Sequence, residues 1–116
     1  MSDLLVQSAG ILGIAAALVH GYLGETKLFA SARIEPHRAR LLLRAVWHCS
    51  VVAWLAMGVL LILVPVMGSE QACAAVIYAS TAVYGAGAVG NAWASRGRHF
   101  GWAWLSVAIG LALVGM

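Results

Sequence analysis

Two histidines, His20 and His48, lie inside otherwise apolar segments of this chain, 19–25 and 44–48. Imidazole is the commonest side-chain metal ligand and also carries protons near neutral pH. Glu25 follows His20 by five residues and adds a carboxylate. Two nitrogens and a carboxylate can bind a transition metal, and two histidines on facing helices can hold haem b. The residue types therefore predict a metal or haem site made of His20, His48 and Glu25, with a membrane redox or electron-transfer role.

Three further polar residues are expected to line this site. Tyr22 and Arg44 lie close to the histidines in sequence, and Asn91 comes from a later helix at the same depth. Arg44 would set the charge state of the site, and Tyr22 and Asn91 would complete its polar lining. The sequence contains no Ser-His-Asp arrangement, P-loop or dinucleotide fingerprint, so it leaves open whether the protein is an enzyme.

The composition places these residues in a membrane protein. The chain has 116 residues, of which 63% are hydrophobic and 9% charged. Soluble domains average about 25% charged residues, and a small soluble domain cannot bury so much apolar surface. We therefore expect a single integral membrane domain over residues 1–116, with the lipid bilayer as its principal partner.

Four apolar segments predict an all-α membrane fold. The expected helices are about 4–25, 36–66, 71–95 and 100–116, separated by turn signals such as Pro36, Gly68 and Gly97. The last segment has 17 residues, which at ~1.5 Å per residue barely crosses a ~30 Å hydrocarbon core. Short connections make consecutive helices antiparallel neighbours, so we expect an up-down bundle of four transmembrane helices.

The positive charges predict the orientation of this bundle. All seven Lys and Arg residues lie in or beside the first and third connections, at positions 27, 33, 38, 40, 44, 96 and 98. The positive-inside rule then places both termini outside and both basic connections in the cytoplasm. The formal charge of +3 is thus a topology signal and no indication of nucleic-acid binding. Four tryptophans are expected to form an aromatic belt at the inner boundary: Trp47, Trp93, Trp102 and Trp104.

Small residues on the first and third helices predict close helix packing. Gly13, Ala17 and Gly21 recur every four residues on the first helix, and Gly87 belongs to a small-residue face of the third. Such faces let helices approach closely within a membrane. We expect them to serve helix packing and the assembly of a homo-oligomer.

Two other functions remain open from the residues alone. Intramembrane His and Glu side chains relay protons, so a homo-oligomer could act as a proton-coupled transporter or channel for a small molecule or ion. A Glu25–Arg44 pair with flanking histidines could equally lock the first helix to the second. The protein would then be a purely structural or accessory membrane subunit.

The pattern His20-x-x-Leu23-Gly24-Glu25, followed by Trp47-His48, resembles a group of small bacterial four-helix membrane proteins. In that group an H-x-x-L-G-E pattern ends the first helix and a W-H pair begins the second. The resemblance covers about the first half of the chain. It implies a bacterial cytoplasmic membrane and a common role for His20, Glu25 and His48, but no activity, because none is established for the group.

Overall fold

The computed structural model describes residues 1–116 and consists of four helical rods without any strand. The first rod is continuous through α1 (Asp3–Leu23), the π-helical turn η1 (Gly24–Leu28) and α2 (Phe29–Ser31). The others are α3 (His37–Leu63), which ends in the 3₁₀ turn η2 (Val64–Val66), α4 (Glu70–Ser95) and α5 (Gly101–Gly115). The predicted all-α fold and its four helices are confirmed, but the first rod continues to Ser31, six residues beyond its expected end at about residue 25.

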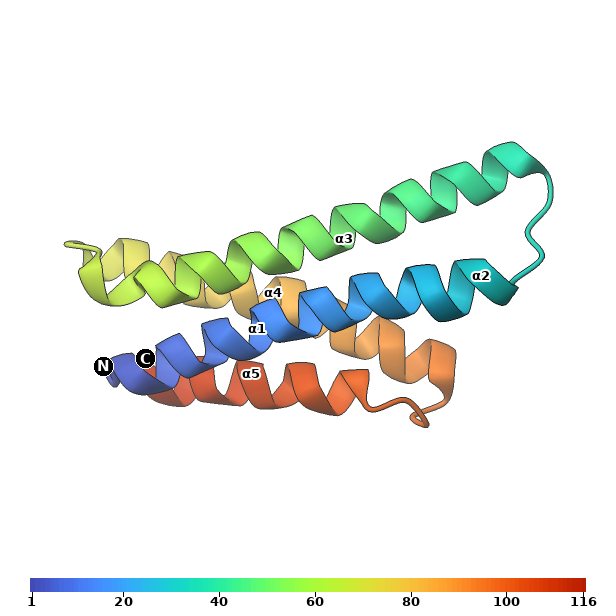
Figure 1. Ribbon diagram of the computed structural model, residues 1–116. Helices are drawn as coiled ribbons and strands as arrows, with labels where there is room; N and C mark the ends of the chain where they lie inside the picture. The colour runs from blue at the N-terminus through green and yellow to red at the C-terminus, as the bar shows by residue number, and fades with distance from the viewer.

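The rods form an up-down bundle in which each helix packs on its neighbours in sequence (Figure 1). α1 also packs along α5, which closes the ring of four helices and brings the two termini together. There the backbone N–H of Ser2 donates to the carbonyl of Gly115 at 2.7 Å. The molecule measures 49 × 26 × 18 Å. α2 and the start of α3 extend past the α4–α5 turn, so one end of the molecule consists of this helix pair alone.

Local sequence accounts for both ends of α4. The hydroxyl of Ser69 accepts from the N–H of Ala72 at 3.3 Å and caps the first turn, as Ser does at helix N-termini. At the other end Arg96 and Gly97 adopt left-handed backbone angles, with φ of 51° and 73°. The N–H of Gly97 then reaches the carbonyl of Ala92 at 2.8 Å. Left-handed residues of this kind terminate helices.

Glycines set the closest approaches between helices. A Cβ on Gly10 would lie 2.6 Å from the carbonyl oxygen of Gly58, so α1 and α3 touch backbone to backbone at this crossing. The Tyr84 hydroxyl reaches from α4 across the core to Gly13 and donates to the carbonyl of Trp54 at 3.0 Å. Small residues thus fix where the rods cross, as they do in membrane bundles.

The four positions predicted to pack helices all make contacts within the chain. Gly13 lies against the Tyr84 ring, Ala17 is fully buried, and Gly87 lies against the Trp54 ring. A Cβ on Gly21 would be 3.4 Å from Val51. Their role in helix packing is therefore intramolecular, and the homo-oligomer stays a prediction.

Three of the rods are long and apolar enough to cross a membrane: Asp3–Ser31, His37–Val66 and Glu70–Ser95. α5 is also apolar but has 15 residues, about 22 Å at 1.5 Å per residue, which is less than a ~30 Å hydrocarbon core. Length and composition thus support three of the four expected spans, and the short α5 runs beside α1 and α4.

Candidate functional site at the junction of α1 and α3

Three charged or titratable side chains form one connected group, which we call the polar cluster: Glu25, Arg44 and His48. Arg44 donates twice to Glu25, from Nε to Oε1 at 2.8 Å and from Nη2 to Oε2 at 2.6 Å. His48 Nε2 lies 2.6 Å from the same Oε1. A carboxylate only accepts hydrogen bonds, so His48 carries its proton on Nε2 and donates. The cluster joins the end of the first rod to the first half of α3.

The π-helical turn η1 and Gly24 allow this junction. η1 presents Glu25 toward α3, and Gly24 leaves room for the indole of Trp47. A Cβ at Gly24 would lie 2.1 Å from Trp47 Nε1, closer than any side-chain contact permits. The indole N–H instead donates to the carbonyl of His20 at 3.0 Å. π-helical turns inside helices are frequent at functional sites.

His20 lies between two indole rings of α3. Its imidazole stacks on Trp47, with ring centroids 4.0 Å apart and planes within 11°, and contacts Trp54 at 4.5 Å. Its Nε2 lies 3.1 Å from the hydroxyl of Ser50. Trp47, Ser50 and Trp54 follow one another at helical spacing on one face of α3, so they form a single surface around His20.

The hydrogen bonds fix where the His20 proton lies. The Ser50 hydroxyl has one proton and donates it to the carbonyl of Trp47 at 2.6 Å. It can therefore only accept from His20, so Nε2 of His20 is the donor. Both histidines thus use Nε2 as a hydrogen-bond donor, His20 toward a hydroxyl and His48 toward a carboxylate.

The two histidines differ in exposure. His20 is partly buried between the helices, whereas the side chains of the polar cluster are about half exposed: 49% for Arg44, 45% for His48 and 35% for Glu25. The cluster therefore lies on an outer side of the α1–α3 pair. His20 lies beneath the polar cluster and packs against Trp47 and Trp54.

No family model, curated protein or solved structure matches the chain.

That geometry does not gather a metal-ligand set. No group of three His, Cys, Asp or Glu side chains is placed to hold a metal ion. Glu25 is already engaged by two donors, and His20 is enclosed by indoles. A metal or an axial haem bond at Nε2 of either histidine would require its present hydrogen bond to break.

Of the three residues expected to line the site, only Arg44 belongs to it. The Tyr22 side chain is 66% exposed and points outward. Asn91 closes the α4–α5 turn instead: its Nδ2 lies 3.3 Å from Nδ1 of His99, and its Oδ1 accepts from the N–H of Trp102 at 3.2 Å. Equal depth along a bundle does not bring residues together, because helix rotation decides which side they face.

The tryptophans around His20 were not recognised from the sequence. Trp47 was expected in an interfacial belt, but it packs inward on His20 and Phe29. Trp104 also binds within the bundle, where its indole N–H donates to the carbonyl of Leu12 at 3.0 Å. The sequence feature that indicates this packing is the spacing of residues 47, 50 and 54, which places them on one face of a helix. Gly24 on the preceding helix leaves room for the Trp47 indole.

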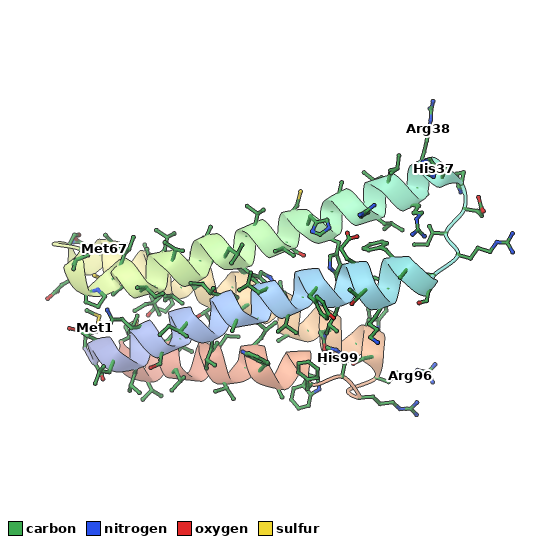
Figure 2. The ribbon with its side chains drawn as sticks, viewed as in Figure 1. Met1, His37, Arg38, Met67, Arg96 and His99 are labelled. Atoms are coloured by element: carbon green, nitrogen blue, oxygen red, sulfur yellow. The ribbon has the colours of Figure 1, made fainter.

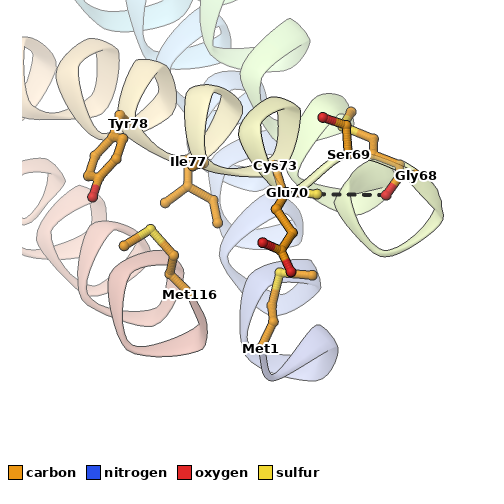
Figure 3. A pocket seen from close by; sticks show the side chains of 10 residues that line it. Met1, Gly68, Ser69, Glu70, Cys73, Ile77, Tyr78 and Met116 are labelled. Atoms are coloured by element: carbon orange, nitrogen blue, oxygen red, sulfur yellow. Dashed lines mark hydrogen bonds between the residues drawn. The ribbon is translucent and has the colours of Figure 1, made fainter.

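A pocket at the other end of the molecule adds nothing to this site. It has a volume of about 660 Å³ and opens between the η2–α4 turn and the chain ends (Figure 3). Its lining includes Met1, Met116, Glu70 and Cys73. The Cys73 thiol forms hydrogen bonds to the carbonyls of Val64 and Met67. It contains no histidine.

Proposed function

We propose that the protein is a structural or accessory subunit of a bacterial cytoplasmic membrane that associates with a second copy of itself. The closure of Glu25 on Arg44 and His48 carries this proposal, since the carboxylate is used to join two helices. Breaking such a cluster by removing one partner leaves a charge uncompensated. Its role is then to hold the first rod on α3 at one level of the membrane.

The outward side of α3 supports self-association. Ala45, Cys49 and Ala53 recur every four residues, and with His48 and Val52 they line an open groove of about 460 Å³. Small residues at this spacing accept a neighbouring helix in membranes. The half-exposed cluster at the edge of the groove would be covered by the second copy, which removes charge from contact with lipid.

Cys49 provides a direct test of this interface. In a Cys73→Ala background Cys49 is the only thiol, and α3 exposes it on the groove. Mild oxidation of the reconstituted protein should give a disulfide-linked dimer, because bridged Cα atoms lie only about 4.4–6.8 Å apart. The matched control moves the single cysteine to Leu18, which is 59% exposed on α1, and should stay monomeric. Equal cross-linking at both positions, or no cross-linking at Cys49, would contradict the proposed interface on α3.

The orientation is part of the same proposal. With both basic turns in the cytoplasm, the two termini lie outside, and the contact between Ser2 and Gly115 supports a common side for them. A reporter enzyme that is active only in the periplasm should be active when fused after Met116. A fluorescent reporter that matures only in the cytoplasm should show no fluorescence at the same position. The opposite pattern would reverse the orientation.

Proton-coupled transport is the second candidate, favoured by one observation. Glu25 and His48 form a titratable pair at 2.6 Å whose side chains both remain partly exposed. Proteoliposomes should then show a proton flux that Glu25→Gln abolishes while the helix content is kept. An equal proton flux in that variant, or no flux above that of empty vesicles, would contradict proton-coupled transport, and the structural role would remain the proposed function.

Metal or haem binding receives less support from the arrangement of His20, Glu25 and His48. A haem-binding protein would purify with a strong visible absorption band, and a metal protein with a stoichiometric ion that both His20→Ala and His48→Ala lose. Either result would restore the cofactor function predicted from the sequence.

A further inference from the structure

The charged residues divide between the two ends of the molecule. Seven Lys and Arg side chains, with Glu25 and Glu35, lie at the end that carries the α2–α3 and α4–α5 turns. The charged side chains at the opposite end are both acidic, Asp3 and Glu70. Figure 2 shows His37, Arg38 and Arg96 at the basic end and Met1 and Met67 at the other. The molecule therefore has a basic end and an acidic end.

Two of the seven cations are used inside the protein. Arg44 binds Glu25, and Arg40 donates to the carbonyls of Phe29 and Ala32, which it ties to the start of α3. The other five form no salt bridge and are exposed: Lys27, Arg33, Arg38, Arg96 and Arg98. Arg38 and Arg96 extend away from the bundle (Figure 2). These five side chains, which we call the basic surface, are free to bind an anion.

Large apolar side chains adjoin the basic surface. Leu41, Leu42 and Leu43 are consecutive on α3 and all at least half exposed. Near the α4–α5 turn, Trp93 is 84% exposed and Trp102 is 39% exposed. Consecutive exposed leucines need an apolar environment on several sides of the helix. A soluble polyanion offers none, whereas a bilayer offers hydrocarbon next to its headgroups.

We propose that the basic surface binds the headgroups of anionic phospholipids in the leaflet that the two turns contact. Guanidinium groups bind phosphate oxygens through two parallel hydrogen bonds. Exposed leucines and indoles would lie in the adjacent acyl and interfacial layers. This proposal requires membrane insertion and is independent of dimer formation or of chemistry at the polar cluster.

Tryptophan quenching by brominated lipids tests the proposal on the intact protein. The purified chain in detergent micelles is titrated with brominated phosphatidylglycerol or brominated phosphatidylcholine, and exposed Trp93 and Trp102 report lipid at the basic end. Each Lys or Arg at an anionic surface changes partitioning about fivefold, so phosphatidylglycerol should bind at least fivefold more strongly. The preference should shrink in 1 M salt, where screening extends only ~3 Å. Equal binding of the two lipids at low salt would overturn the proposal.

Substitutions then locate the effect. R33Q/R38Q and R96Q/R98Q should each lower the preference at least fivefold, while D3N/E70Q at the acidic end should keep it, with helix content checked by circular dichroism. An unchanged preference in both arginine variants would overturn the assignment to these turns. Inorganic phosphate at equal ionic strength should compete no better than chloride, and selective competition by phosphate would indicate a free-anion site instead. Should an arginine variant fail to fold, the lipid comparison on the unsubstituted chain still decides.

Discussion

Gly24 is the position where one added methyl group should disturb the α1–α3 junction most. A Cβ there would lie 2.1 Å from Nε1 of Trp47 and 2.7 Å from its Cδ1. The indole would have to move, and it would leave both its stack on His20 at 4.0 Å and its hydrogen bond to the His20 carbonyl at 3.0 Å. Gly24→Ala therefore tests the geometry of the whole junction.

The expected magnitude follows from these contacts. Forcing a methyl group into a packed site destabilises by about 1–3 kcal/mol. Loss of the indole hydrogen bond adds about 1 kcal/mol, and part of the stacking energy, about 0.5–1.5 kcal/mol, is also lost. Replacing Gly by Ala in a helix returns up to about 1 kcal/mol. The free energy of unfolding should fall by about 2–3 kcal/mol.

The matched control is Gly85→Ala on α4, where a Cβ would meet no atom within 4 Å. It carries the same helix-propensity gain, so the difference between the two variants isolates the contact with Trp47. Unfolding by sodium dodecyl sulfate titration in mixed micelles measures both free energies, and near-ultraviolet circular dichroism reports the tryptophan environment. If Gly24→Ala lies within about 0.5 kcal/mol of the control and its tryptophan spectrum is unchanged, the tight Gly24–Trp47 packing is refuted.

Two further predictions concern the core and the thiols. Tyr84→Phe removes the buried hydrogen bond to the carbonyl of Trp54, so the free energy of unfolding should fall by about 1–2 kcal/mol in the same titration; no change would mean that the bond contributes nothing. Cys49 is exposed whereas Cys73 is buried and bonded to backbone carbonyls, so a maleimide should label Cys49 rapidly in micelles and Cys73 only after unfolding. Equal labelling rates in the single-cysteine variants would contradict the burial of Cys73.

The helices were predictable because the bounds depend on local chemistry. Pro36, Ser69 and Gly97 interrupt apolar runs through backbone effects that act within a few residues, and the structure ends or begins helices at or beside each of them. The grouping of Glu25 with Arg44 and His48 was also predictable, since an antiparallel pair of consecutive helices brings their facing ends to one level. The sequence pattern thus identified the junction.

The details of the junction depend on helix rotation, which no local pattern encodes. His20 and His48 share a depth but differ in surroundings, because Trp47 and Trp54 enclose one ring and Glu25 binds the other. Asn91 faces its own turn, and Tyr22 points outward. The π-helical turn at Gly24–Leu28 coincides with the close approach of Gly24 to the Trp47 indole, a tertiary contact that the local sequence does not specify.

The contact of α1 with α5 has a consequence for synthesis of the chain. The indole N–H of Trp104 donates a hydrogen bond to the carbonyl of Leu12, 92 residues earlier in the chain. The backbone N–H of Ser2 donates to the carbonyl of Gly115, the last residue of α5. A ribosome makes α1 before α5, so the surface of α1 that α5 will cover stays vacant until α5 has been made. α3 and α4 can pair with their neighbours earlier. α5, the shortest of the four rods, therefore completes the ring, and a chain stopped before it would leave that surface of α1 open to any other apolar helix.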